Sequence, residues 1–362
     1  MAEFKVAVIG CGGIANGKHM PSLKQVPGVE MVAFCDIIIE RAQAAAEKFG
    51  VEGARVYSCY KELLEKEQLD VVHVCTPNRS HCEISVAAME AGCHVMCEKP
   101  MAINEADART MLETAKKTGK KLTIGYQSRY RPDAQYLKAE CEKGTLGEVY
   151  YAKAHAIRRR AVPTWGVFLN EYEQGGGPLV DIGTHALDLT LWMMDNYKPK
   201  YCVGTKYHKL SQQKGNTGNA WGDWNPDEFT VEDSAFGFIV MENGATIVLE
   251  SSWALNTLDV HEAKTSLCGT LAGADMLNGL RINGVNNGRQ YVLEPNFKAG
   301  GVAFVEGDSN ARPEVLEALQ WYHALKTNTD PCVLPEQAYI VSAILDGIYK
   351  SAISGEPFYF NK

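Results

Sequence analysis

The stretch "FKVAVIGCGGIA", residues 4–15, decides the fold of the first part of the chain. An apolar run of strand length leads into the pattern G-x-G-x-x-A, and a helical pattern follows it directly. In this context Gly10 permits a tight turn, Gly12 lets backbone approach a pyrophosphate, and Ala15 keeps the helix close to the strand. The stretch therefore predicts a strand–turn–helix unit whose helix N-terminus binds an anion. The residues of this turn that we expect to contact a dinucleotide are Gly10, Gly12, Gly13 and Ile14.

Strand-like and helix-like patterns alternate from this stretch up to residue 127. One helical pattern ends at Gly50, a predicted C-cap, and another is flanked by Asn104 as N-cap and Gly119 as C-cap. This alternation predicts parallel strands with crossover helices, which is an α/β Rossmann domain over residues 1–127. The strand-like runs are "FKVAVIG" (4–10), "EMVAFCD" (30–36), "ARVYSC" (54–59), "DVVHVCT" (70–76), "HVMCEKP" (94–100) and "KLTIGYQ" (121–127).

The pattern changes after residue 127. A helix is followed by the strand-like run "EVYYAKAHAI" (148–157), a glycine-rich segment and several long period-2 stretches, and "ENGA" (242–245) is typical of a hairpin turn. We therefore expect residues 128–362 to form an α+β domain with a large, mainly antiparallel sheet that binds substrate and mediates oligomerisation. Helical patterns near 313–328 and 336–354 close the chain and could pack back on the Rossmann domain.

The composition favours an enzyme that acts on small molecules. The 362 residues include 36 Lys and Arg against 44 Asp and Glu, and the only basic run is Arg158–Arg160, so neither a nucleic acid nor an acidic membrane is expected as a partner. No signal-peptide pattern and no apolar window of 18 residues are found, which predicts a soluble cytoplasmic protein. Eleven cysteines without framework spacing predict reduced thiols rather than disulfides.

Asp36 indicates which dinucleotide is bound. It ends the second predicted strand, where a carboxylate accepts hydrogen bonds from the adenosine ribose and repels a 2′-phosphate. Arg41 lies further on and could soften this preference. We therefore predict NAD as the cofactor, with NADP less favoured.

Two further strand ends carry polar clusters. "CTPNRSH" (75–81) and "CEKPMA" (97–102) follow the fourth and fifth predicted strands, at the carboxyl edge where open α/β sheets bind ligands. Pro100 fixes the backbone beside Lys99 and would aim its ammonium group into the cleft. Further cofactor contacts are expected from Thr76, Asn78, His81, Glu98, Lys99 and Gln127.

A second candidate site lies in "GGGPLVDIGTHALDL", residues 175–189. Burying a carboxylate and an imidazole in so apolar a segment is costly unless each has a partner, so the two form either a structural pair or a working site. On a helix Asp181, His185 and Asp188 would line one face, and the preceding glycines would let backbone approach a bound ring. The pattern favours a working site.

Together, Gly10–Ala15, "EKP" (98–100), "GYQSRYRP" (125–132) and the segment 175–189 resemble the Gfo/Idh/MocA oxidoreductase family over essentially the whole chain. The resemblance implies an NAD(P)-binding Rossmann domain, a C-terminal α+β domain, and alcohol–ketone chemistry on sugars or cyclitols. It places the family's lysine at Lys99 and its Asp-x-x-x-His pair at Asp181 and His185. Because an exposed C-terminal sheet commonly mediates association in this family, a homo-oligomer is expected.

Oxidising an alcohol needs a hydride acceptor at the carbon and a base at the hydroxyl. His185 is the candidate base, Lys99 would polarise the same oxygen, and Asp181 would orient the imidazole and bind a neighbouring hydroxyl. Whether Lys99 or His185 takes the proton stays open, because a buried lysine can also act as base.

We predict a pyranose sugar or glycoside as substrate, oxidised at a ring secondary hydroxyl with C3 favoured, and a free inositol as the nearest rival. Trp165, Trp221 and Trp224 could present flat faces to the ring. The residues expected to bind the sugar are Lys99, Tyr126, Arg158, Trp165, Asp181 and His185.

Three other functions share some of these features. A zinc dehydrogenase would need a metal cluster among His73, Cys75, His81, Cys82, Cys93, His94 and Cys97. Such a cluster is not implied, because strand alternation sends His73 and Cys75 to one face but His94 and Cys97 to opposite faces, and no C-x-x-C is present, so no metal site is predicted. An NAD-dependent glycosidase that oxidises its sugar transiently is a second alternative. A non-catalytic NAD sensor would be expected to lack Lys99 or His185, and both are present.

Overall fold

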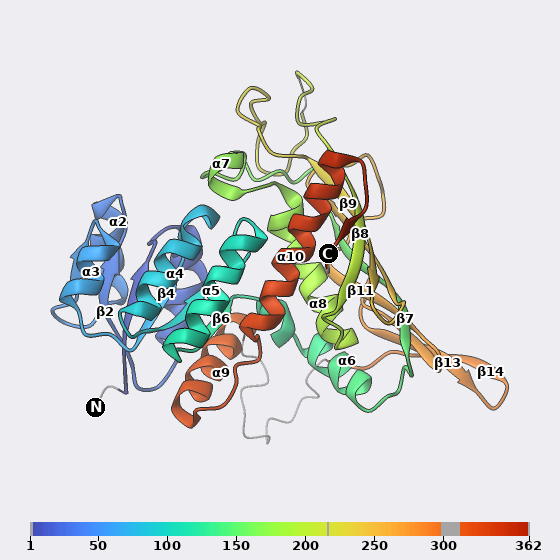
Figure 1. The fold of residues 1–362 in the computed structure, drawn as a ribbon, viewed down its shortest axis with the longest axis horizontal. Coiled ribbons are helices and arrows are strands. Elements are labelled where there is room, and N and C mark those ends of the chain that lie inside the picture. Colours follow the sequence, from blue (N-terminus) through green and yellow to red (C-terminus); the bar gives the residue numbers. More distant parts are fainter. Residues whose placement is uncertain (1–2, 216, 298–311, 361–362) are drawn as a thin grey trace. The chain divides into compact units, whose positions relative to one another are not determined.

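The computed structural model describes residues 3–215, 217–297 and 312–360. The chain divides into two compact units, one made of Met1–Gln127 with Ala311–Tyr339 and the other of Ser128–Asn310 with Ile340–Lys362 (Figure 1). The first boundary falls at the predicted end of the Rossmann domain. The structure adds to that domain a segment from near the C-terminus.

The first unit contains a six-stranded parallel sheet in the order β3-β2-β1-β4-β5-β6, which confirms the Rossmann prediction. Each of the six predicted runs forms one strand, and helices connect them. The strands are β1 (Phe4–Ile9), β2 (Val29–Cys35), β3 (Arg55–Tyr57), β4 (Val71–Val74), β5 (His94–Cys97) and β6 (Leu122–Ile124). The helices are η1 (Ala15–His19), α1 (Met20–Leu23), α2 (Ile39–Phe49), α3 (Tyr60–Lys66), η2 (Asn78–Ser80), α4 (His81–Glu90), α5 (Glu105–Thr118) and α9 (Pro313–Thr327).

The predicted helix ends of this unit are confirmed. Asn104 caps α5 by accepting a hydrogen bond from the Asp107 N–H at 2.8 Å, and Gly119 ends the helix in the left-handed conformation. Gly50 follows α2 and its N–H bonds to the Ala46 carbonyl, although its φ is −69° and any residue can adopt that backbone. Local sequence signals therefore set these three helix boundaries.

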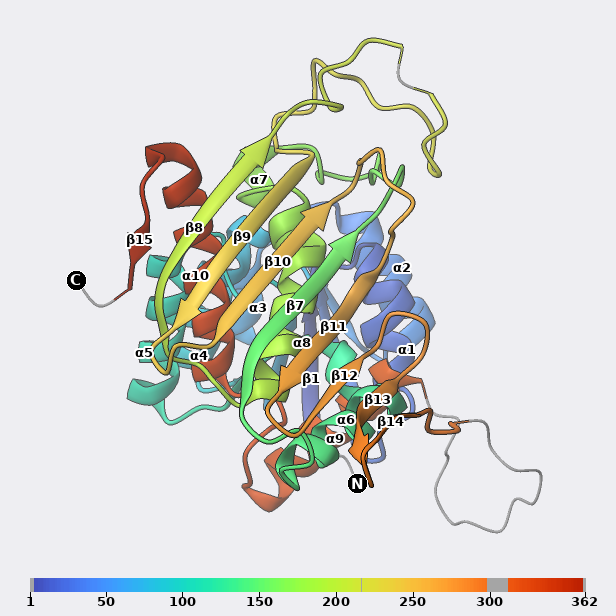
Figure 2. The same ribbon diagram turned by 90° about the vertical axis from the view of Figure 1, so that its right-hand side faces the viewer.

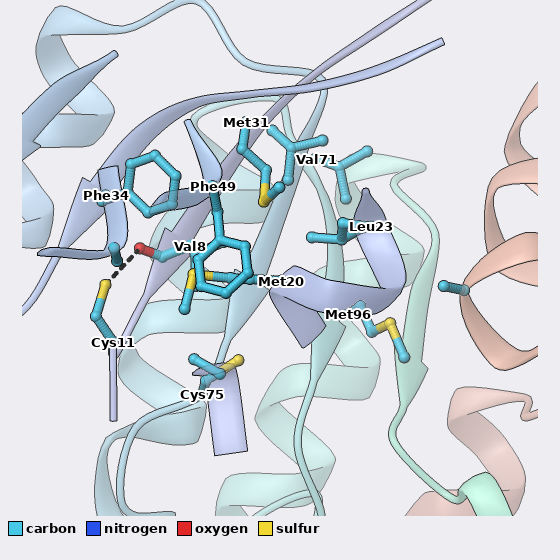
Figure 3. Close-up of a cluster of buried hydrophobic side chains, with 14 of the residues drawn as sticks. Val8, Cys11, Met20, Leu23, Met31, Phe34, Phe49, Val71, Cys75 and Met96 are labelled. Carbon is cyan, nitrogen blue, oxygen red and sulfur yellow. Dashed lines mark hydrogen bonds between the residues drawn. The ribbon is translucent and has the colours of Figure 1, made fainter. Parts of the chain in front are cut away.

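The core of the first unit is an apolar cluster on one face of the sheet (Figure 3). Strands β1, β2, β4 and β5 contribute buried side chains, and α1 and α2 cover them. Trp321 and Tyr322 of α9 belong to the same cluster and are almost fully buried. A helix from near the C-terminus is therefore part of this core.

The second unit contains a nine-stranded sheet in the order β14-β13-β12-β11-β7-β10-β9-β8-β15. Strands β7 and β10 pair in parallel, and the other described pairs are antiparallel, which confirms a mainly antiparallel sheet. The "ENGA" turn joins β9 to β10 as predicted. The strands are β7 (Val149–Ile157), β8 (Pro199–Tyr207), β9 (Ser234–Met241), β10 (Thr246–Ser252), β11 (Glu262–Gly269), β12 (Ala272–Asp275), β13 (Arg281–Asn286), β14 (Arg289–Leu293) and β15 (Phe358–Tyr359).

Helices cover one face of this sheet, and Figure 2 shows α8 (Thr184–Met194) behind β7 and β11. Buried alanines at Ala152, Ala154 and Ala156 let α8 lie close to β7. The other helices are η3 (Gln127–Tyr130), α6 (Pro132–Glu142), α7 (Glu171–Gln174), η4 (Leu179–Gly183) and α10 (Pro335–Ser354), whose first five residues belong to the first unit. Within the described residues, no helix is both long and apolar enough to span a membrane.

Candidate active site

The glycine-rich turn after β1 has the shape that a dinucleotide requires. Gly10 has a φ of +90°, and a Cβ there would lie 2.6 Å from the Cys75 carbonyl, so the turn packs against the end of β4. A Cβ at Gly12 or Gly13 would meet nothing within 4 Å, which leaves open space at the start of the following helix. Ala15 is fully buried against the strand. The turn therefore fits a pyrophosphate at a helix N-terminus.

Asp36 is held beside this turn. Its Oδ2 accepts a hydrogen bond from the Cys11 N–H at 2.8 Å, and its Oδ1 accepts one from the Ile38 N–H at 2.9 Å. Each carboxylate oxygen has a second lone pair, so the side chain can still accept hydrogen bonds from ribose hydroxyls. The predicted position of Asp36 at the end of β2 is confirmed.

The ends of β4 and β5 are joined through His81, which is fully buried. Its Nδ1 lies 2.8 Å from the Pro100 carbonyl and its Nε2 lies 3.0 Å from the Thr76 carbonyl. Burial lowers the pKa of His81, and the two carbonyls oppose that shift. Both ring nitrogens therefore contact backbone carbonyls, whereas the sequence predicted that His81 contacts the cofactor. His81 therefore fixes the positions of Thr76 and Pro100, and its own contact with the cofactor stays a prediction.

The Thr76 hydroxyl also points to a ligand at the carboxyl edge of the parallel sheet. Its Oγ1 is buried and has no hydrogen-bond partner among the residues that the structure describes. Buried hydroxyls are rarely left unsatisfied in a finished structure. The position of Thr76, close to the Gly10 turn, therefore fits a contact with a dinucleotide.

Glu98, next to Lys99, is the centre of a buried polar network. Its Oε1 accepts hydrogen bonds from Lys18 Nζ at 2.8 Å and from His19 Nε2 at 2.7 Å, and its Oε2 accepts one from the Lys99 N–H at 3.2 Å. Burial alone would raise the pKa of the Glu98 carboxyl, but Lys18 and His19 hold it well below its usual range. Lys18 also pairs with Glu317 at 2.9 Å. The backbone that carries Lys99 is therefore tied to an ionised carboxylate.

The network continues from His19 to α9. His19 Nδ1 lies 2.9 Å from His73 Nδ1, and His73 Nε2 lies 2.9 Å from the Tyr322 hydroxyl. Because Glu98 can only accept, His19 carries its proton on Nε2, His73 carries its proton on Nδ1, and Tyr322 donates. His19 and Tyr322 were not predicted from the sequence, and His73 was considered only as a metal ligand, although a histidine inside the apolar run "VVHV" was a usable signal for a buried polar contact.

In the second unit, Glu232 anchors the three-glycine segment that precedes η4. This buried carboxylate accepts hydrogen bonds from the Gly177 N–H at 2.9 Å, the Leu179 N–H at 3.2 Å and the Tyr349 hydroxyl at 2.8 Å. A Cβ at Gly176 would overlap the Tyr349 ring, and one at Gly177 would overlap the Glu232 carbonyl. Close packing against Tyr349 and Glu232 therefore explains why glycine is needed at these positions. The sequence had suggested instead that the glycines let backbone approach a bound sugar ring.

The Asp181 carboxylate is oriented by fixed neighbours. Trp253 Nε1 donates a hydrogen bond to its Oδ2 at 3.0 Å, and Arg158 Nη1 lies 4.0 Å from the same oxygen. Arg158 is itself held by two hydrogen bonds of 2.6 Å to Glu262. Asp181 and His185 are both partly exposed on a helix whose other residues are mostly buried. The arrangement places a carboxylate and an imidazole, both partly exposed, one helical turn apart.

The helix that carries them departs from prediction in two ways. Residues 179–183 form a π-helical turn before α8 begins, a wider turn that is frequent at functional sites. Asp188 does not join Asp181 and His185, because it is fully buried in a two-bond ion pair with Arg129. The prediction that three polar residues share one working face was therefore wrong for Asp188.

The comparisons with known proteins assign the family. Residues 4–126 match the family model described as "Oxidoreductase family, NAD-binding Rossmann fold", and residues 134–274 match "GFO/IDH/MocA C-terminal domain". The chain belongs to the Gfo/Idh/MocA family. It is therefore an oxidoreductase whose first unit is of the nicotinamide-dinucleotide-binding type.

Several relatives in the Gfo/Idh/MocA family have assigned activities. The chain is 38% identical over 354 residues to the D-glucoside 3-dehydrogenase of Escherichia coli K12, covering 98% of this chain and 97% of that protein. It is 32% identical over 197 residues to an inositol 2-dehydrogenase of Salmonella typhimurium, covering 54% and 56% of the two chains. The glucoside enzyme thus matches over nearly its full length.

Solved Gfo/Idh/MocA-type structures agree on the fold. Levoglucosan dehydrogenase in complex with NADH and levoglucosan superposes with a TM-score of 0.81 at 19% identity, covering 99% of both chains. An aldose-aldose oxidoreductase from Caulobacter crescentus gives a TM-score of 0.78 at 23% identity, covering 98% and 99%. At these identities the likeness shows the fold alone.

The other residues predicted to contact the cofactor or the sugar differ in burial and in hydrogen bonding. Gln127 accepts a hydrogen bond from Lys18 Nζ at 3.3 Å, and Tyr126 is fully buried. Trp165 is exposed, but Trp224 is buried and donates its indole N–H to the Ser211 carbonyl, so its predicted sugar contact was wrong. Among the described residues, no group of three or more His, Cys, Asp or Glu side chains could hold a metal ion.

The contact between Gly177 and Glu232 makes a testable prediction about stability. Gly177→Ala should lower the free energy of unfolding by about 1–3 kcal/mol, because the added methyl meets a backbone carbonyl that cannot turn away. Urea denaturation measures the change. Gly17→Ala is the matched control, because a Cβ there meets nothing within 4 Å. Equal stability of the two variants would contradict the packing argument.

Proposed function

We propose that the protein is an NAD-dependent dehydrogenase that oxidises a ring secondary hydroxyl of a pyranose sugar or glycoside, with C3 favoured. The observation that carries this proposal is the partly exposed Asp181 carboxylate, fixed by Trp253 and Arg158, with His185 one helical turn further on. A fixed carboxylate recognises a sugar hydroxyl by accepting its hydrogen bond. The full-length similarity to a glucoside dehydrogenase supports the same substrate class.

The first unit supplies the cofactor site in this proposal. Gly10, Gly12, Gly13 and Ile14 would hold the pyrophosphate, Asp36 the ribose, and Thr76, Asn78 and Glu98 the remaining contacts at the sheet edge. Bound NAD supplies the hydride acceptor for the substrate C–H.

Three side chains divide the proton chemistry. Lys99 donates a hydrogen bond to the reacting hydroxyl oxygen and polarises it, and Asp181 binds the adjacent hydroxyl. As the C–H hydride leaves, the hydroxyl proton passes to His185, with Lys99 as the other candidate base. In the reverse direction the same base returns the proton to the alkoxide oxygen.

A substrate screen tests the proposal. Enzyme and NAD are incubated with methyl glucosides, free hexoses and inositols, NADH is followed by absorbance, and the carbonyl carbon is located by NMR. We expect NADH formation with the glucosides and a carbonyl at C3. Oxidation of inositols alone would assign the rival activity, activity confined to acyclic alcohols would reject the proposal, and aglycone release without net NADH would indicate the glycosidase.

Asp36 makes cofactor choice a separate prediction. NAD should bind more tightly than NADP because the Asp36 carboxylate, held by the Cys11 and Ile38 amides, repels a 2′-phosphate. Asp36→Ala should narrow the affinity gap, measured by fluorescence titration with NADH and NADPH. Equal affinities in the unmodified protein would remove the argument.

The proposal also includes a homo-oligomer. Val203 on β8 and Phe238 on β9 are large apolar side chains that are both at least 40% exposed. Cross-strand pairing places them next to each other on the sheet. An exposed apolar patch on a sheet favours association with a second copy. Sedimentation velocity tests this part of the proposal.

A further inference from the structure

Two exposed tryptophans form an aromatic surface on the second unit. Trp165 is 51% exposed and Trp221 is 43% exposed, although their ring centroids are only 4.9 Å apart in an edge-to-face arrangement. Phe168 contacts Trp165 from another side at 5.8 Å. We call Trp165 and Trp221 the aromatic pair. The two adjacent rings form a contiguous aromatic surface, which is the kind of surface that ligand sites use.

The loops that carry the aromatic pair are fastened together. Asn219 accepts a hydrogen bond from the Val162 N–H at 2.8 Å and donates one to the Val162 carbonyl at 2.9 Å. The Ala220 N–H bonds to the Arg160 carbonyl at 3.1 Å, and the Thr164 hydroxyl bonds to the Trp221 carbonyl. These contacts hold Trp221 against the segment that carries Trp165. The surface is therefore preorganised, which lowers the entropic cost of binding a ligand.

Trp224 shows that the loop is anchored from behind. Its buried indole N–H donates to the Ser211 carbonyl at 3.0 Å, and its ring contacts Phe229 edge-to-face. Trp221, three residues earlier, instead presents its ring to solvent. Figure 2 shows this loop, in yellow, beyond the end of β8. One tryptophan therefore fixes the loop while the other remains available for contact.

Arg158 connects the aromatic pair to the proposed sugar site. Its guanidinium carbon lies 5.3 Å from the Trp221 ring centroid, and its Nη1 lies 4.0 Å from Asp181 Oδ2. Its two hydrogen bonds to Glu262 keep it in this place. One side chain thus separates Trp221 from the carboxylate that is proposed to bind the reacting ring.

We propose that the aromatic pair binds the second ring of a glycoside whose first ring is oxidised beside Asp181. This inference rests on the proposed function and narrows it to substrates of disaccharide size. Sugar rings present C–H faces that pack on indole rings, and they present hydroxyls that accept hydrogen bonds from a guanidinium. Arg158 stands where the linkage between the two rings would pass.

Steady-state kinetics with matched substrates tests the inference. The one-ring substrates are methyl α- and β-glucoside, and the two-ring substrates are maltose and cellobiose. Trp165→Ala and Trp221→Ala should each raise KM for the preferred disaccharide about tenfold or more, with little change in kcat. KM for the one-ring substrate should stay within about twofold. Tyr150→Ala, which removes an exposed aromatic from β7, is the control and should change neither value.

Trp165→Leu keeps an apolar side chain at this position but removes the flat ring, so it should raise KM for the disaccharide as Trp165→Ala does. An unchanged kcat and an unchanged KM for the one-ring substrate would show that the variants are folded. Equal rises in KM for one-ring and two-ring substrates would place the aromatic pair at the reacting ring and overturn the inference. Unchanged KM with altered sedimentation would show a subunit interface and also overturn it.

Calorimetry separates this inference from the proposed function. Binding of maltose and cellobiose is measured in the presence of NADH, where no turnover is needed. If no sugar is oxidised but disaccharide binding is lost in Trp165→Ala and Trp221→Ala, the proposed reaction fails and the second-ring site stands. If glucosides are oxidised and disaccharide binding is the same in all variants, the site fails and the reaction stands.

Discussion

Replacing Lys99 by alanine should lower kcat by about two or more powers of ten and leave NAD binding nearly intact. The loss should be this large because the variant removes a positioned hydrogen-bond donor, which is also the alternative base, from the reacting oxygen. The Lys99 main chain keeps its hydrogen bond to Glu98, so the strand end that faces the cofactor keeps its shape. Stopped-flow hydride transfer and fluorescence titration with NADH measure the two effects.

His185→Ala should reduce kcat by a similar factor. Lys117→Ala on α5 and His323→Ala on α9 are matched controls, because each removes an exposed side chain of the same type. If NAD binding were lost together with turnover in both active-site variants, Lys99 and His185 would have structural roles. A kcat within threefold of the unmodified protein would remove them from the chemistry.

The largest effect on stability is expected at Arg129. This guanidinium bonds to Asp188 through Nε at 3.0 Å and Nη2 at 2.6 Å, and both side chains are fully buried. Arg129→Met leaves the carboxylate buried without its counter-ion, which should lower the free energy of unfolding by about 3–5 kcal/mol. Urea denaturation followed by circular dichroism measures the change.

A double variant distinguishes the lost ion pair from lost packing. Arg129→Met with Asp188→Leu removes both charges, and much of the stability should return because no charge is left buried. Lys143→Met, which breaks an exposed pair with Glu140, should change stability by less than about 1 kcal/mol. If Arg129→Met were as mild as Lys143→Met, the Asp188 carboxylate would have to be reached by water.

Features that depend on residues close together in the sequence could be predicted, whereas contacts between distant residues could not. The six parallel strands and the helix boundaries at Asn104 and Gly119 depend on neighbouring residues, so periodicity and capping were enough to predict them. The dinucleotide fingerprint likewise identified Asp36 at the end of a strand, and the family's Asp-x-x-x-His pair identified Asp181 on a helix. These positions are set locally.

Partners far apart in the chain were not predictable. Asp188 has the spacing of a site residue, but the chain brings Arg129 to it from 59 positions away. His73 meets Tyr322 across 249 positions, and Glu232 reaches back to the glycine segment. No local pattern encodes such pairs. Trp221 and Trp224 looked equivalent for the same reason, because only the folded loop decides which ring is buried.

The helix α9, which closes the core of the first unit, bears on the order in which the protein matures. A ribosome that has released residues 1–127 has delivered all six parallel strands, yet Trp321 and Tyr322 have not been translated and their share of the apolar core is open to water. The Tyr322 hydroxyl, which donates to His73 in the hydrogen-bond network that leads to Glu98, is synthesised equally late. The Rossmann sheet therefore lacks part of its apolar core until α9 (Pro313–Thr327) has been synthesised. During that time its apolar surface is a natural target for chaperones.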